Sequence, residues 1–242
     1  MVFSDITSKI EQSNALDFSL IFSKSIELFK QVWVQGFIIV LLTFATLIPF
    51  YILMYIPLLI AGVTDPEMLR SEEAPPELII PMVILMPIMF LGITTISILF
   101  NAAFLRICKN KDLNLAESDN YFFYFKKRYV SKSIALALLT LGLMLLGMLA
   151  CGIGVFYMVV PISLIPAFLA FDEELTATEI IKSCFSLGNK NWLVIFGLVI
   201  VMGLVAELGV LLCFVGVLFT AMLAKIPVYF MYKDSIGFSA EA

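Results

Sequence analysis

The chain contains no histidine, and its four cysteines, Cys108, Cys151, Cys184 and Cys213, include no pair spaced as CxxC. Zinc sites and similar metal sites need such Cys and His spacings, so the sequence predicts neither a metal site nor another cofactor. Charged residues are also scarce, at 14% of 242 residues, and the net charge is -4. A negative chain has little attraction for nucleic acid, and we expect no nucleic-acid partner.

Long apolar runs dominate what the chain does have. Hydrophobic residues make up 62% of it and the mean hydropathy is +1.05. Soluble domains have only about 45–50% apolar residues. A helix needs roughly 20 apolar residues to cross about 30 Å of hydrocarbon. Runs of this length predict an all-α, polytopic membrane protein.

The first two spans are expected at 33–62 and 78–105, where apolar residues follow one another without a charge until the run ends. Between them lies the acidic stretch "TDPEMLRSEEAPPE" at 64–77. Its charged residues are too costly to place in hydrocarbon. We therefore predict an outer acidic loop over 64–77.

Four further spans are expected in the second half of the chain. Residues 133–171 carry no charge and are long enough for two helices, which the glycines of "CGIG" at 151–154 would separate. The same argument divides residues 192–232 into two helices, with a reversal at Glu207–Gly209. The sequence thus predicts a bundle of six transmembrane helices.

The basic residues predict the orientation of these spans. If both termini are inside, Arg70 alone is outside and Lys225 lies within the last span, while the other thirteen Lys and Arg residues fall on inner segments. Cytoplasmic loops of membrane proteins carry such an excess of Lys and Arg. The prediction is N-in and C-in.

Two similar segments precede apolar runs: "KSIELFKQVW", beginning at Lys24, and "KSCFSLGNKNW", beginning at Lys182. On a helical wheel, 16–33 and 176–192 each place most apolar side chains on one side and lysines on the other. Thr176 and Glu179 have the spacing of a capping box, which predicts the start of the second helix. Basic, amphipathic helices beside a span are typical of segments lying in the plane of the membrane interface.

A third, rougher amphipathic candidate covers 117–132, so we expect two or three cytoplasmic interfacial helices. The alternative is that each is a cytoplasmic extension of its span that packs on neighbouring helices. Either way, residues 1–242 are interpreted as one membrane domain of three helix-plus-hairpin units, over 15–105, 116–171 and 174–232. For Cys151 and Cys213, the sequence leaves two alternatives open: a disulfide between them, or two free thiols.

The segment "FLAFDEELTATEIIKSCFSLGNKNWLVIFGLVIV" at 168–201 and the later "KIPVYFMYKD" at 225–234 resemble the bacterial glycerophosphoryl diester phosphodiesterase membrane-domain family and its six-span relatives. In some relatives this region precedes a soluble catalytic barrel. The resemblance implies a membrane domain of the bacterial inner membrane, and we expect no catalytic barrel here. The family's enzymatic name is therefore not transferred.

Few polar side chains fall inside the expected spans. Asn101, Glu207 and Lys225 are the candidate intramembrane polar residues, because ionisable groups in a membrane commonly have a function. Glu207 and Lys225 would lie about 27 Å apart along a helix and cannot pair. Lys225 either extends its stem toward the cytoplasmic headgroups or binds an anionic headgroup or a partner carboxylate. The basic residues predicted to contact anionic lipid are Lys126, Lys127, Arg128, Lys132 and Lys225.

No acid, base or nucleophile pattern predicts catalysis. The favoured hypothesis is a non-enzymatic partner subunit of a membrane assembly or homo-oligomer, in contact with membrane lipids. A transporter or lipid-handling protein that uses proline-kinked spans is the alternative, and a lipid-modifying enzyme comes third. A pocket between kinked spans with Asn101 or Lys225 pointing inward would favour transport, and a bundle sealed by apolar side chains would favour the partner role.

The predicted topology can be tested with single cysteines placed at Lys30 and Lys182. A membrane-impermeant thiol reagent should label both in inverted vesicles and neither in sealed right-side-out vesicles, since both positions are predicted to be cytoplasmic. The unsubstituted chain provides the background from its own thiols. Labelling only in right-side-out vesicles would overturn the topology.

Overall fold

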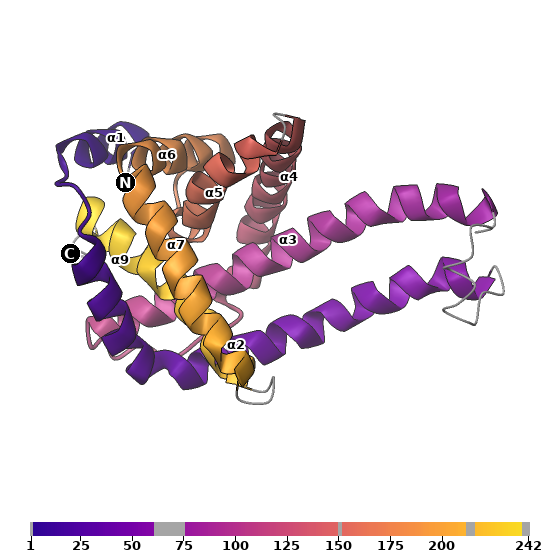
Figure 1. Cartoon of the computed structure of the whole chain (residues 1–242), viewed down its shortest axis with the longest axis horizontal. Coiled ribbons are helices and arrows are strands. Elements are labelled where there is room, and N and C mark those ends of the chain that lie inside the picture. Colours follow the sequence, from indigo (N-terminus) through magenta and orange to yellow (C-terminus); the bar gives the residue numbers. More distant parts are fainter. Residues whose placement is uncertain (1, 61–75, 150–151, 212–215, 239–242) are drawn as a thin grey trace.

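The computed structural model describes residues 2–60, 76–149, 152–211 and 216–238, and every element in these ranges is helical. Figure 1 shows their arrangement. In chain order the elements are α1 (Phe3–Gln12), α2 (Phe18–Ile60), α3 (Pro76–Asp112), η1 (Phe123–Phe125), α4 (Lys127–Leu149), α5 (Ile153–Phe171), α6 (Ala177–Lys190), α7 (Trp192–Glu207), η2 (Leu208–Leu211), α8 (Gly216–Thr220), η3 (Ala221–Lys225) and α9 (Ile226–Ser235).

The predicted class, an all-α bundle with membrane-spanning helices, is confirmed for this part of the chain. Five helices are long and apolar enough to cross a membrane. Their apolar stretches are Phe18–Pro57, Ile80–Asp112, Lys127–Leu149, Ile153–Phe171 and Trp192–Val210. The predicted outer loop lies outside the described residues over 64–75, as do Cys151 and Cys213.

The second half of the expected 192–232 pair is not one continuous α-helix. It consists of α8, the 3₁₀ segment η3 and α9 in direct succession. Pro227 lies in the first turn of α9. Proline lacks an amide hydrogen, and its ring clashes with the carbonyl four residues earlier, so an α-helix cannot pass through it unchanged. This accounts for the tighter 3₁₀ turn at Ala221–Lys225.

The predicted break between the helices at 133–171 is confirmed. Helix α4 ends at Leu149 and α5 begins at Ile153. Gly152 has a φ of 77°, in the left-handed region that glycine adopts without steric cost. A glycine at this position therefore allows the chain to reverse between the two helices.

The amphipathic segments differ from one another in the structure. The capping box of Thr176 and Glu179 is present, and α6 ends at Lys190, with Asn191 between it and the start of α7. In contrast, the first segment continues into its apolar run as the single helix α2. The third prediction is wrong for most of its length, because 117–122 is not helical and α4 begins only at Lys127. There Asn120 accepts a hydrogen bond from the Phe122 amide, a local contact that competes with helix formation.

The two repeated segments bury equivalent positions when 159 is added to the residue number. The pairs are Ile21 with Ile180, Ser25 with Cys184, Leu28 with Leu187, Val32 with Asn191 and Ile39 with Leu198. Both helices also start alike, since Asp17 and Thr176 accept hydrogen bonds from the amides of Leu20 and Glu179. The structure therefore aligns Trp33 with Trp192 and shifts the shared Lys-Ser pair by one residue.

Helix α4 follows the same burial pattern. Tyr129, Ser133, Leu136 and Thr140 are buried, at the spacing of Ile21, Ser25, Leu28 and Val32. In each case the buried residues lie on one helical face because steps of three and four residues return to the same side. The first helices of the three predicted units thus share one packing pattern.

The last helices of those units meet at the centre of the molecule, where α3, α5 and α9 contact one another. Their ends are joined by polar bonds: Tyr229 donates to Asp112 at 2.5 Å, Lys233 forms an ion pair with Asp112, and Tyr232 donates to Asp172 at 2.6 Å. Burial raises the pKa of the Asp172 carboxyl, and the hydrogen bond from Tyr232 opposes that rise. These bonds fix α9 against the ends of α3 and α5.

A short amphipathic helix that the sequence analysis did not predict, α1, packs on α6 through buried Ile6 and Ile10 (Figure 1). Lys190 donates to the backbone oxygens of Ile10, Glu11 and Ser13, at 2.5, 3.0 and 2.5 Å. A cation at these carbonyls compensates the negative end of a helix. The lysine of "GNKNW" therefore holds the N-terminal helix in place.

We predict that Lys190→Gln loosens α1. Losing the charge-assisted bonds should cost about 1 kcal/mol of local stability, so amide exchange across residues 3–12 should accelerate several-fold. Hydrogen exchange with mass spectrometry measures this directly. The matched control is Lys182→Gln on the exposed face of the same helix, and equal exchange in both variants would contradict the assigned role of Lys190.

Candidate binding sites

Two cavities inside the bundle share the residues Ser97, Asn101 and Lys225. The first has a volume of about 230 Å³ and lies between α2, α3 and η3; its other lining residues are Ile39, Val40, Thr43, Phe44, Phe100, Ala221 and Met222. The second, of about 270 Å³, lies between α3, α4 and α5 and is otherwise lined by Ile93, Thr94, Ile98, Thr140, Ile162, Ser163, Ile165 and Pro166. We call them the Lys225 cavities.

The local fold explains how these polar residues come together. Ser97 and Asn101 lie one turn apart on α3, and the Asn101 amide donates to the Ser97 hydroxyl oxygen at 3.2 Å. Lys225 is the last residue of η3, immediately before α9. Pro227 cannot donate a helical hydrogen bond, and Lys225 stands just before it, where the 3₁₀ segment gives way to α9, and lines the same cavities as Ser97 and Asn101. Asn101 and Lys225, both predicted as intramembrane polar residues, thus belong to one site.

Both residues lie well away from the polar ends of their helices. The Asp112 and Lys233 ion pair marks the ends of α3 and α9. Asn101 precedes Asp112 by about 16 Å along the helix, and Lys225 precedes Lys233 by about 12 Å. Half the thickness of the hydrocarbon core is about 15 Å. The Lys225 cavities therefore lie near half that thickness if the ion pair is at the membrane surface.

In the described part of the chain, Lys225 is the one charged residue that lines the Lys225 cavities, and the other lining residues are neutral. Neither lining includes an aspartate or a glutamate. Lys225 is exposed, and within the described residues its ammonium has no hydrogen-bond or ion-pair partner. Thr140 and Ser163 donate their hydroxyl hydrogens to carbonyls of their own helices, at 2.8 and 2.7 Å, and retain acceptor capacity. An anion with an apolar body would match this lining.

Glu207, the third predicted intramembrane residue, does not join the site. It is the last residue of α7, is exposed, and lines neither Lys225 cavity. This agrees with the separation predicted between it and Lys225.

The basic residues predicted to contact lipid have different environments. Arg128 and Lys132 donate to the backbone oxygen of Glu173, at 3.2 and 2.6 Å, and so tie the start of α4 to the segment after α5. The Lys126 ammonium lies 4.6 Å from the Phe123 ring centre. Lys127 is exposed at the first position of α4. Part of this basic cluster therefore has structural partners of its own.

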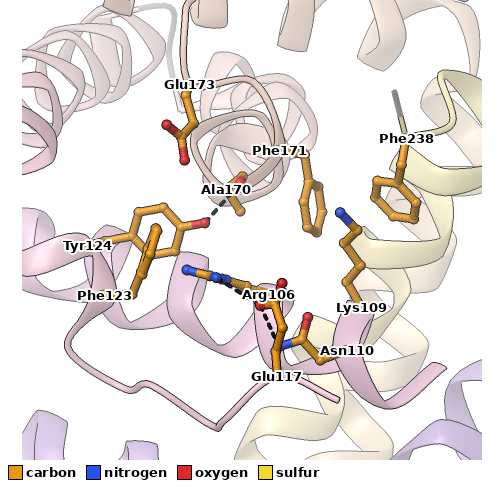
Figure 2. Close-up of a pocket in the computed structure, with 10 residues that line it drawn as sticks. All are labelled: Arg106, Lys109, Asn110, Glu117, Phe123, Tyr124, Ala170, Phe171, Glu173 and Phe238. Atoms are coloured by element: carbon orange, nitrogen blue, oxygen red, sulfur yellow. Dashed lines mark hydrogen bonds and ion pairs between the residues drawn. The ribbon is translucent and has the colours of Figure 1, made fainter. Parts of the chain in front are cut away.

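Figure 2 shows a further cavity, of about 190 Å³, that the sequence analysis did not predict. We call it the Arg106 cavity. Its charged and amide residues come from three segments: Arg106, Lys109 and Asn110 from α3, Glu117 from the segment after it, and Glu173 from the segment after α5. No sequence window holds all of them, so only the fold brings them together. Its remaining lining residues are Phe123, Tyr124, Ala170, Phe171 and Phe238.

Arg106 organises the Arg106 cavity. It forms an ion pair with Glu117 at 2.8 Å, and its guanidinium carbon lies 3.5 Å from the Phe123 ring centre. The hydrogen bond from Arg106 lowers the pKa of the Glu117 carboxyl. Tyr124 donates to the Ala170 carbonyl at 2.8 Å, and burial raises the pKa of the Tyr124 hydroxyl. The cavity wall is thus held in place by bonds on both sides (Figure 2).

Among the described residues, no group of three or more His, Cys, Asp and Glu side chains is placed to hold a metal ion, and Cys108 and Cys184 are buried free thiols.

Comparisons with models of protein families, with curated proteins and with solved structures find no match. The function proposed for this chain is therefore based on the contacts and charges described above.

The Arg106 and Glu117 pair predicts a pH effect. Because the folded-state pKa of Glu117 is lowered from 4.5, the pair stabilises the segment after α3 at neutral pH, and this stabilisation is lost as the pH falls below that value. A nitroxide label at exposed Ser118 should therefore become more mobile below pH 4.5 in electron paramagnetic resonance spectra. In Glu117→Gln the label should be mobile at every pH. A label at exposed Ser131 on α4 is the control, and a Ser118 label insensitive to both changes would contradict the prediction.

Proposed function

We propose that this chain binds an anionic amphiphile in the Lys225 cavities and acts as a transporter or lipid-handling protein. The observation that carries the proposal is the position of Lys225, which lines both cavities together with Asn101 and Ser97. A lysine within a membrane bundle is costly unless it has a counter-charge or a path to water. An anion bound in either cavity would supply that counter-charge.

The broken helix beside Lys225 also supports this function. Transporters commonly place their binding sites where spans are interrupted, because the interrupted backbone is then buried in protein or lines a cavity. Here η3 interrupts the run from Gly216 to Ser235 at Lys225, and Pro166 of α5 lines the second cavity. We therefore favour the transport or lipid-handling hypothesis over the partner-subunit hypothesis.

The proposed setting follows from the sequence. We propose that α8, η3 and α9 together make a sixth span, so that both termini are cytoplasmic. From the resemblance to the glycerophosphoryl diester phosphodiesterase membrane-domain family we propose that the membrane is the bacterial inner membrane. Within this proposal α6 lies in the membrane interface and no catalytic step is assigned.

A second candidate function, a non-enzymatic partner subunit, is favoured by the hairpin of α2 and α3. The two helices lie side by side and extend beyond the other helices (Figure 1). Their far ends expose large apolar side chains, with Ile52 59% and Ile80 69% exposed. Lipid or an apolar helix of another membrane protein would cover such a surface.

Binding of a fluorescent fatty acid to the protein in nanodiscs of uncharged lipid tests the leading proposal. Lys225→Gln should weaken binding about tenfold or more, because a charge-assisted contact is lost, and Lys225→Arg should retain most of it. The alcohol of the same chain length should bind the wild type and Lys225→Gln alike.

The control variant is Lys30→Gln, at an exposed position of α2. Fatty-acid binding that is equal in Lys225→Gln and the wild type would overturn the proposal. Purification from native membranes in mild detergent separates the two candidates: bound lipid without protein supports lipid handling, whereas a stoichiometric protein partner supports the subunit role.

A further inference from the structure

The Arg106 cavity is separate from the Lys225 cavities, and its charges are balanced. Arg106 and Lys109 supply two positive charges, and Glu117 and Glu173 two negative ones. Arg106 and Glu117 already neutralise each other at 2.8 Å. Among the described residues, Lys109 and Glu173 have no ion-pair partner. The cavity therefore offers one uncompensated cation and one uncompensated anion.

These two charges come from different walls of the cavity. Lys109 projects from α3 toward Phe238, with its ammonium 4.9 Å from the ring centre, and Glu173 lies on the other side, above Tyr124 (Figure 2). The Glu173 backbone oxygen is taken by Arg128 and Lys132, while its carboxylate interacts with the Tyr129 hydroxyl. A ligand that carried both charges could satisfy Lys109 and Glu173 at once, whereas a simple anion would be repelled by Glu173.

The Arg106 cavity also contains an unpaired hydrogen-bond donor. The Nη1 nitrogen of Arg106 is buried without a partner in the described part of the chain. Guanidinium and ammonium groups are the usual donors to phosphate oxygens. On the Glu173 side, the ring of Tyr124 provides a face that attracts an alkylammonium group, while Phe171 and Phe238 line the Lys109 side (Figure 2). One end of the site therefore suits a phosphate and the other a primary amine.

Size and location favour a lipid headgroup over a small ion. A water molecule takes about 30 Å³, so a cavity of about 190 Å³ holds a polyatomic group rather than a single ion. The uncharged run of α3 ends at Leu105, so Arg106 and Lys109 lie in the first turn beyond it. Residues at the end of a span lie at headgroup level.

We propose that the Arg106 cavity binds the phosphoethanolamine headgroup of a membrane lipid. Lys109 and Arg106 contact the phosphate, and Glu173 accepts hydrogen bonds from the ammonium group. A choline headgroup has no N–H to donate to Glu173, and a glycerol headgroup has no positive charge. Of these three headgroups, only phosphoethanolamine has both a phosphate and a primary amine.

The test is retention of lipid by the purified protein, measured by native mass spectrometry after exchange into mixed micelles with equal amounts of three lipids. Phosphatidylethanolamine should be retained about tenfold more than phosphatidylcholine or phosphatidylglycerol, as expected for one added charge-assisted hydrogen bond. Equal retention of the three lipids, or preference for phosphatidylglycerol, would overturn the assignment. Binding of soluble phosphoethanolamine without retention of the lipid would overturn the lipid as the source.

Two variants separate the roles of the two charges. Glu173→Gln should reduce the preference for phosphatidylethanolamine over phosphatidylglycerol about tenfold, because only the amine contact is lost. Lys109→Gln should reduce retention of both lipids by similar factors. An unchanged preference in Glu173→Gln, in a protein that stays monodisperse, contradicts the proposal. Lys30→Gln is the matched control, and Lys225→Gln should leave this preference unchanged, so the two proposed sites can fail independently.

Discussion

The contact of Asp112 with Tyr229 and Lys233 is the interaction on which the interior of this bundle depends. It joins the end of α3 to α9 across more than a hundred residues of chain. Once these ends are fixed, helical rise sets the positions of residues further inside, and Asn101 and Lys225 arrive at similar depths. The Lys225 cavities are therefore a consequence of a bond formed elsewhere.

Repeated packing accounts for much of the remaining architecture. The first helices of the three predicted units bury the same helical positions, at Ile21, Tyr129 and Ile180 and onward from each. The last helices of the units, α3, α5 and α9, contact one another in the centre. The outer helices resemble one another and the inner ones do not, and two of the inner helices, α3 and α5, supply residues to both candidate sites.

Apolar length and glycine position predicted the helical class and the break at Gly152, because crossing a membrane leaves the backbone few alternatives. The Thr176 capping box was predictable because its two residues lie only three positions apart in sequence. The segment 117–122 was not, since its aromatic spacing imitates a helix while Asn120 bonds locally. Asn101 and Lys225 could be selected as unusual polar residues. The placement of Lys109 and Glu173 on one cavity could not be predicted, because they lie 64 positions apart in the chain and only tertiary packing brings them together.

The single ammonium shared by the Lys225 cavities has a consequence for stoichiometry. One positive charge neutralises one monovalent anion, and a second anion in the adjoining cavity would meet repulsion without compensation. Occupancy of the two cavities is then mutually exclusive. Within the proposed function, an anion that moved from one cavity to the other would keep the same counter-ion.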